Sequence, residues 1–140
     1  MKLKILFFIG LFCQLCFSQT ILGKWTTVDD ETGKEKGIVE VFEYKGKIYG
    51  RIIEIFEQDK RHFKCEKCEG DDKNKPILGL IIIKGLTKKG DSYEGGKIID
   101  PKNGKSYHCK IKLDGKDKLV VRGYIGIPLI GRSQTWIRLK

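Results

Sequence analysis

Apolar and polar residues alternate in short runs along this chain, and glycine-bearing turns separate the runs. The alternation is clearest over residues 106–113, where one face carries Tyr107, Cys109, Ile111 and Leu113 and the other carries Ser106, His108, Lys110 and Lys112. Successive side chains of a β-strand point to opposite faces. The pattern therefore predicts a strand with one dry face and one solvated face.

The same alternation predicts eight strands over the rest of the chain. Four of the connections contain a glycine that can adopt the positive φ of a tight hairpin turn. Closing eight hairpin-linked strands into a barrel removes the exposed sheet edges. The sequence therefore predicts an all-β fold, an antiparallel up-and-down β-barrel of about eight strands. The predicted strands are approximately Leu22–Asp29, Ile38–Tyr44, Lys47–Glu57, Ile77–Thr87, Ser92–Asp100, Lys105–Leu113, Lys118–Ile125 and Ser133–Leu139, with the tight turns at Lys45-Gly46, Lys89-Gly90, Asn103-Gly104 and Asp114-Gly115.

Two neighbouring segments depart from simple alternation. The predicted fourth strand is apolar on both faces between residues 77 and 83, so its outer side needs a cover. The preceding loop, residues 58–75, contains 18 residues of which 11 are charged. Loops of this length serve as lids, binding loops or covers, and this loop is a candidate for the missing cover.

The N-terminus has the layout of a secretory signal peptide. Lys2 and Lys4 precede an apolar run over residues 5–17, and a short polar step begins at Ser18. We expect cleavage after Ser18, which leaves residues 19–140 as a single domain in the periplasm or outside the cell. No later segment approaches the roughly 20 apolar residues of a membrane-spanning helix, so we expect no transmembrane segment.

The charge and the chemistry-bearing residues favour a binding protein over an enzyme. The formal net charge is +10 over 140 residues, but basic and acidic residues are interspersed, which indicates a solvated surface and no nucleic-acid partner. The two histidines, His62 and His108, fall on a loop and on a solvated strand face, and neither a nucleophile-elbow serine nor a phosphate-binding glycine loop is present. We expect a monomer without enzymatic activity, and no cofactor.

Two cysteines, Cys65 and Cys68, lie three residues apart in the charged loop. An oxidising compartment favours a disulfide, most simply between these two, although either could pair with Cys109. A zinc site would need a second ligand pair, such as His62 with a nearby carboxylate. A redox-active pair usually needs a helix N-terminus, which the sequence does not predict. We expect the Cys65–Cys68 disulfide, no metal site, and a buried thiol at Cys109.

One motif connects the two ends of the predicted barrel. Gly23-Lys24-Trp25 at its start, together with Arg138 in its last strand, resembles the signature of lipocalins and related calycin barrels. The resemblance implies that Trp25 plugs the closed end of the barrel and that Arg138 lies across its ring, a favourable cation–π contact. Trp25 and Arg138 are accordingly expected to be structural residues.

A more specific resemblance covers nearly the whole chain after Ser18. The ordered segments are similar to a secreted bacterial family, the domain of unknown function numbered 2147, which has a lipocalin-like fold and no settled activity. Those segments are Gly23-Lys24-Trp25, Ile48-Tyr49-Gly50-Arg51-Ile52, Cys65-Glu66-Lys67-Cys68, Pro76-Ile77-Leu78-Gly79, Gly95-Gly96-Lys97-Ile98, Gly104-Lys105-Ser106-Tyr107, Arg122-Gly123-Tyr124-Ile125-Gly126 and the run from Gly131 to Arg138.

Polar and aromatic residues gather on one side of the last predicted strand. Arg132, Gln134, Trp136 and Arg138 share that side, and if Arg138 covers Trp25 the side is the barrel interior. Buried charges must be paired, so this interior fits a small apolar or amphipathic ligand with an acidic group. The alternative is a barrel filled by side chains, acting as a structural or interaction module of the cell envelope. The candidate ligand-binding residues are Tyr49, Arg51, Tyr107, Arg122, Tyr124, Arg132, Gln134 and Trp136.

Overall fold

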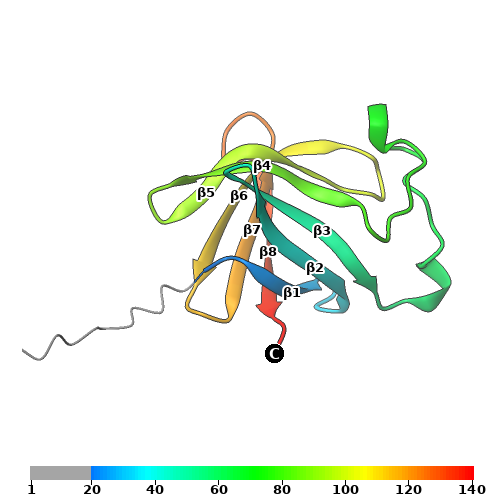
Figure 1. Cartoon of the computed structure of the whole chain (residues 1–140), viewed down its shortest axis with the longest axis horizontal. Helices are drawn as coiled ribbons and strands as arrows, with labels where there is room; N and C mark the ends of the chain where they lie inside the picture. The colour runs from blue at the N-terminus through cyan, green and yellow to red at the C-terminus, as the bar shows by residue number, and fades with distance from the viewer. Residues whose placement is uncertain (1–19) are drawn as a thin grey trace, which may run out of the picture.

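Eight antiparallel strands close into one barrel in the computed structural model, which describes residues 20–140 (Figure 1). The predicted signal peptide, residues 1–18, lies outside the described residues. Each strand pairs with its neighbours in chain order, and β1 closes the barrel against β8 through the pair Trp25–Arg138. The strands are β1 (Gly23–Val28), β2 (Glu35–Tyr44), β3 (Lys47–Ile55), β4 (Ile81–Lys89), β5 (Ser92–Ile99), β6 (Ser106–Asp114), β7 (Lys118–Tyr124) and β8 (Gly131–Arg138). This architecture confirms the predicted fold class.

Two strands begin three or more residues away from their predicted starts, and the other strand boundaries agree within two residues. β2 begins at Glu35 rather than Ile38, and β4 begins at Ile81 rather than Ile77. Residues 77–80 form a turn instead, in which the Leu80 amide donates to the Ile77 carbonyl at 3.0 Å and Gly79 has φ of 93°. The apolar run continues across this turn because Leu80 is buried there, so hydrophobicity alone could not locate the start of the strand.

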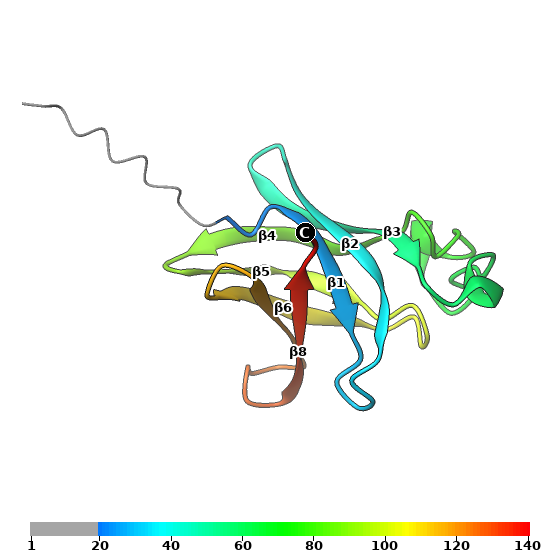
Figure 2. The ribbon, with the colours of Figure 1, turned by 90° about the horizontal axis from the view of Figure 1, so that it is seen from below.

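The barrel has two different ends. The tight β2–β3, β4–β5 and β6–β7 turns lie at the closed end, where β1 starts and β8 finishes. The longer loops, residues 29–34, 56–80, 100–105 and 125–130, lie at the open end. Figure 2 shows the β1–β2 and β7–β8 loops at the same end, and an ion pair joins Arg132, near the start of β8, to Asp30 of the β1–β2 loop.

Side chains fill the centre of the barrel. The largest fully buried ones are Trp25, Trp136, Ile83, Leu86, Ile111 and Leu119. A Cβ on Gly50 would lie only 3.1–3.2 Å from the core side chains of Ile83 and Val39. One hollow of about 260 Å³ lies outside the barrel beside Asp72 and Lys84, and another of similar size lies at the closed end, beside Leu22, Tyr93 and the core residues Ile48 and Leu86. An eight-stranded barrel is just wide enough for its own side chains, and in this barrel they fill the centre.

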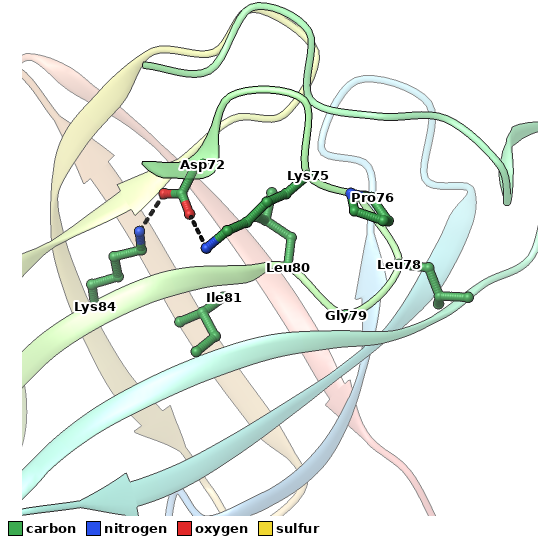
Figure 3. Close-up of a pocket in the computed structure, with 8 residues that line it drawn as sticks. All are labelled: Asp72, Lys75, Pro76, Leu78, Gly79, Leu80, Ile81 and Lys84. Atoms are coloured by element: carbon green, nitrogen blue, oxygen red, sulfur yellow. Dashed lines mark hydrogen bonds and ion pairs between the residues drawn. The ribbon is translucent and has the colours of Figure 1, made fainter. Parts of the chain in front are cut away.

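Residues 56–80, which we call the strap, run along the outside of the barrel at the right of Figures 1 and 2. The strap contains two short 3-10 turns, η1 (Gln58–Lys60) and η2 (Gly70–Asp72). Asp72 forms ion pairs with Lys84 of β4 and with Lys75 (Figure 3). Burial alone would raise the pKa of Asp72, but its contacts with Lys84 and Lys75 outweigh burial and lower it. The strap is thus the cover that the apolar β4 needs, and Ile82 on the outer face of β4 is buried.

The cysteines follow the prediction. Cys65 and Cys68 form a disulfide with a Cα–Cα distance of 5.3 Å, and both are buried in the strap. Cys109 is a free, buried cysteine on the inner face of β6. Burial raises the pKa of the Cys109 thiol to about 12.

Thiol titration should therefore distinguish folded from unfolded protein. Without reductant, residues 19–140 should show one reactive thiol in denaturant and essentially none when folded, because a buried thiol with a high pKa forms little thiolate. A colorimetric thiol assay in the two solvents measures both values. Three reactive thiols in the unreduced, unfolded protein would contradict the disulfide.

Candidate binding site at the open end of the barrel

Inward-facing residues near the open end are partly buried or, at Arg132, exposed, in contrast to those at the centre. The strand pairings put them on the same face as the buried core: Ile52 opposes Val39, Ile98 opposes Tyr107, and Gln134 opposes Val121. We call this set the mouth residues: Thr27, Ile52, Ile98, Tyr107, Arg132 and Gln134. They are the part of the barrel interior that solvent reaches.

A chain of polar contacts crosses the mouth. Arg132 donates from Nε and Nη2 to Asp30 Oδ2 at 3.0 and 2.6 Å, and its Nη2 lies 3.0 Å from a Glu31 oxygen. Gln134 Nε2 lies 3.5 Å from Asp30 Oδ1, and Gln134 Oε1 accepts from Trp136 Nε1 at 3.1 Å. The chain therefore runs from the exposed guanidinium of Arg132 down to the buried indole of Trp136.

The exposed end of this series of polar contacts is the Arg132 guanidinium, which is held by the carboxylates of Asp30 and Glu31. The hydrogen bond to Asp30, with the attraction of Asp30 and Glu31, raises the pKa of Arg132. The Arg132 side chain is 62% exposed and that of Asp30 is 25% exposed. An exposed ion pair of this kind contributes little stability, so another carboxylate could replace Asp30 on Arg132 at little cost.

A glycine of β7, Gly123, separates Arg132 of β8 from the aromatic side chain of Tyr107 on β6. Tyr107 Oη accepts from Asn103 Nδ2 at 3.2 Å, which holds the ring at the mouth. Gly123 pairs with Arg132 and has no side chain, and a Cβ there would lie 3.4 Å from Ile98 Cγ2 and 3.6 Å from Tyr107 Cβ. The backbone of β7 therefore leaves the Ile98 and Tyr107 side chains accessible from the side of Arg132.

Four of the predicted ligand-binding residues lie on the outer face of the barrel. Arg122 and Tyr124, two of the predicted ligand-binding residues, do not line the interior, because Leu119 and Val121 of β7 occupy the inward positions and alternation turns the other two outward. Tyr49 and Arg51 face outward for the same reason, since Ile48 and Gly50 face the core. A ligand inside the barrel would not contact these four residues.

Each of the four has partners on the outer surface. Arg51 forms an ion pair with Glu40 at 3.2 Å, and Tyr49 stacks on Phe42. Arg122 donates to the Pro128 carbonyl at 2.7 Å and to Ser133 Oγ at 2.9 Å. Tyr124 stacks on His108 with ring centroids 5.3 Å apart.

Trp25 and Arg138 form a plug at the closed end. The Arg138 guanidinium carbon lies 4.3 Å from the Trp25 ring centroid, and Trp25 Nε1 donates to the Ile21 carbonyl at 2.9 Å. Arg138 also donates to three backbone carbonyls, those of Thr20, Leu22 and Lys116. Arg138 is therefore fully engaged with the protein and is not available to a ligand.

Asp30 is the site residue that sequence reasoning missed. Asp30 lies 102 positions before Arg132 in the chain, and only barrel closure brings the two loops together. The sequence signal was an Asp29-Asp30 pair at a strand end, which is typical of an ordinary turn. Asp29 does have that role, since its Oδ1 accepts from the amides of Glu31 and Thr32.

Two further observations concern metals and membranes. Residues 20–140 contain no group of three His, Cys, Asp or Glu side chains arranged to hold a metal ion. Among the same residues, no helix has the length and apolar character to cross a bilayer.

The fold resembles that of a solved lipocalin, whereas no curated protein matches the chain. The similar structure is described as protein HP1028 from the human pathogen Helicobacter pylori, which belongs to the lipocalin family. The two share 24% sequence identity and a TM-score of 0.75, with 86% of this chain and 84% of that chain covered. At this identity the likeness establishes the fold alone. Residues 23–138 match the family model described as an uncharacterized protein conserved in bacteria, so the chain belongs to this bacterial family, DUF2147.

Proposed function

We propose that this protein is a secreted, monomeric, non-catalytic binding protein that holds one small amphipathic molecule at the open end of its barrel. The observation that carries the proposal is the polar chain from Arg132 through Asp30 and Gln134 to Trp136, placed among inward-facing apolar groups that solvent reaches. The predicted signal peptide supports secretion, and the lipocalin-like fold supports binding of a small ligand.

The geometry favours an anionic head group and a short apolar part. A carboxylate could replace Asp30 on Arg132 and accept two parallel hydrogen bonds, each worth roughly 1.5–3 kcal/mol where water is excluded. Ile52, Ile98 and Tyr107 would contact the apolar part. Since Trp25 and Trp136 fill the barrel below them, the tail cannot extend far into the interior.

Tryptophan emission provides the test. Trp136 is hydrogen-bonded to Gln134, so a ligand that displaces Gln134 should change the Trp136 emission saturably. A titration series should include fatty acids of increasing chain length and small aromatic carboxylates. Arg132→Gln should weaken the best ligand about tenfold or more, because roughly 1.4 kcal/mol corresponds to a factor of ten.

Arg51→Gln is the matched control, because Arg51 is also ion-paired but lies on the outer face of β3. It should leave the affinity unchanged. If no carboxylate changes the emission, and native mass spectrometry of protein from its own host shows no bound molecule, the carrier function is excluded.

The second candidate is a structural or interaction module of the cell envelope. The packed centre of the barrel supports it, since an interior filled by side chains has no room for a ligand. It would act through its outer surface. A negative emission titration therefore favours this candidate.

A further inference from the structure

The β7–β8 loop, residues 125–130, exposes four large aliphatic side chains at one end of the barrel. Their exposed fractions are 63% for Ile125, 53% for Ile127, 87% for Leu129 and 62% for Ile130. Single exposed apolar side chains are common, but a contiguous group of this kind marks an interaction site. In Figure 1 this loop is the orange connection that projects at the top of the barrel.

Hydrogen bonds hold the loop in its projecting shape. The Ile125 amide donates to the Ile130 carbonyl at 3.0 Å, and the Ile130 amide donates to the Ile127 carbonyl at 3.0 Å. Arg122 on the outer face of β7 donates to the Pro128 carbonyl at 2.7 Å. The side chains therefore cannot turn onto the barrel without loss of these bonds, and Arg122 places the loop beside the outer face of β7.

That outer face carries cations directly opposite one another. Lys97 of β5 pairs with Lys84 on one side and with His108 on the other, and Lys110 of β6 pairs with Arg122 of β7. Like charges at opposed positions of a sheet destabilise it. We call Lys97, Lys110 and Arg122 the basic stripe.

The stripe is only partly neutralised by the protein itself. Glu94 lies 3.7 Å from Lys110 but is closer, at 3.1 Å, to Lys89. Among the described residues, Lys97 and Arg122 have no carboxylate within 4.0 Å. A row of opposed cations with so little internal compensation is complementary to an anionic surface.

We propose that the β7–β8 loop and the basic stripe together dock the protein on an anionic lipid bilayer. The four aliphatic side chains enter the boundary between headgroups and acyl chains, and Lys97, Lys110 and Arg122 contact the headgroups. Interfacial binding of this kind depends on buried apolar area and on attraction to anionic lipids, and the structure provides both next to each other. The net charge of +10, or +8 without Lys2 and Lys4, acts in the same direction.

A second copy of this chain is a poorer occupant of the same surface. Symmetric dimers use the same patch on both subunits. A dimer through the β7–β8 loop would bring one basic stripe close to another, and the cations would repel. An anionic bilayer provides an apolar interior and negative charge without repulsion between two basic stripes.

Sedimentation with vesicles tests the proposal on residues 19–140. The protein should bind vesicles that contain phosphatidylglycerol, bind phosphatidylcholine vesicles at least tenfold more weakly, and lose affinity as salt is raised. The double variant Ile127→Asn, Leu129→Asn should reduce binding to the anionic vesicles at least tenfold. Both side chains are exposed, so thermal unfolding should be unchanged.

Two matched controls test whether vesicle binding depends on this surface rather than on exposed apolar side chains or lysines anywhere on the protein. Leu139→Asn removes another exposed aliphatic side chain, at the closed end, and should bind vesicles normally. Lys97→Gln with Lys110→Gln should weaken binding, whereas Lys116→Gln with Lys118→Gln, in the β6–β7 connection and at the start of β7, should have a smaller effect.

Three outcomes would overturn the proposal. One is equal binding to neutral and anionic vesicles, and another is unchanged binding by the loop and stripe variants. The third is concentration-dependent self-association that Leu129→Asn abolishes, which would make the loop a dimer contact. Ile127→Asn with Leu129→Asn should leave the tryptophan emission titration with carboxylates unchanged, so failure here is distinguishable from failure of the proposed ligand site.

Discussion

Trp25→Ala should lower the free energy of unfolding by about 3–5 kcal/mol, the usual range when a large buried aromatic side chain is truncated. Trp25 is fully buried and packs in the core at the closed end. Its loss also leaves the Ile21 carbonyl without its donor and removes the ring under Arg138. Urea-induced unfolding followed by circular dichroism measures the change.

Tyr44→Ala is a suitable control for this variant. Tyr44 is an aromatic residue of the same sheet, but its side chain is 56% exposed at the end of β2. We expect a loss within about 1 kcal/mol for this surface site. Similar losses for the two variants would contradict the view that Trp25 plugs the barrel and stabilises its closed end.

The elements of the barrel were predictable because each depends on local pattern. Alternation identifies a strand within a few residues, and a glycine at a turn identifies a hairpin. Lys45-Gly46 is an example, since both residues have positive φ in the structure, 49° and 78°. Hairpins between successive strands leave few arrangements other than an up-and-down barrel, so local information determined the fold class.

The inward face of each strand was harder to predict when both faces carry polar or aromatic groups. In β7 the alternation separates Arg122 and Tyr124 from Leu119 and Val121, but it does not by itself show which set faces the core. Hydrophobicity favours Leu119 and Val121, and the structure follows it. Arg122 and Tyr124 were grouped as a polar and aromatic set with the last strand, but the register pairs Arg122 with Ser133, on the outer face.

Contacts between distant parts of the chain were not predictable. The pairing of Asp30 with Arg132 and that of Asp72 with Lys84 depend on how loops cross the surface of the closed barrel. Many lysines and carboxylates in this charged sequence could form such pairs. The position of the strap was foreseeable from the need to cover β4, but its anchoring contacts were not.

The second large expected effect concerns Gly104, where the strap contacts the β5–β6 turn. Gly104 lies in the β5–β6 turn with φ of 70°, and a Cβ on it would overlap the carbonyl of Lys67, between the disulfide cysteines of the strap. Cys65 Sγ lies 3.7 Å from the Pro101 carbonyl oxygen in the same turn. The disulfide loop therefore sits directly on the backbone of the β5–β6 turn.

Gly104→Ala should consequently destabilise the protein by about 2–5 kcal/mol, which combines a left-handed backbone with alanine, roughly 1–2 kcal/mol, and steric overlap, roughly 1–3 kcal/mol. Gly115→Ala isolates the first contribution, because Gly115 has φ of 71° and nothing within 4 Å of its added Cβ. Urea unfolding of the two variants gives the difference. Equal losses would mean that the Lys67 carbonyl moves aside freely. A larger loss at Gly104, with faster proteolysis within residues 56–80, would show that the disulfide holds the strap in place by fitting against this turn.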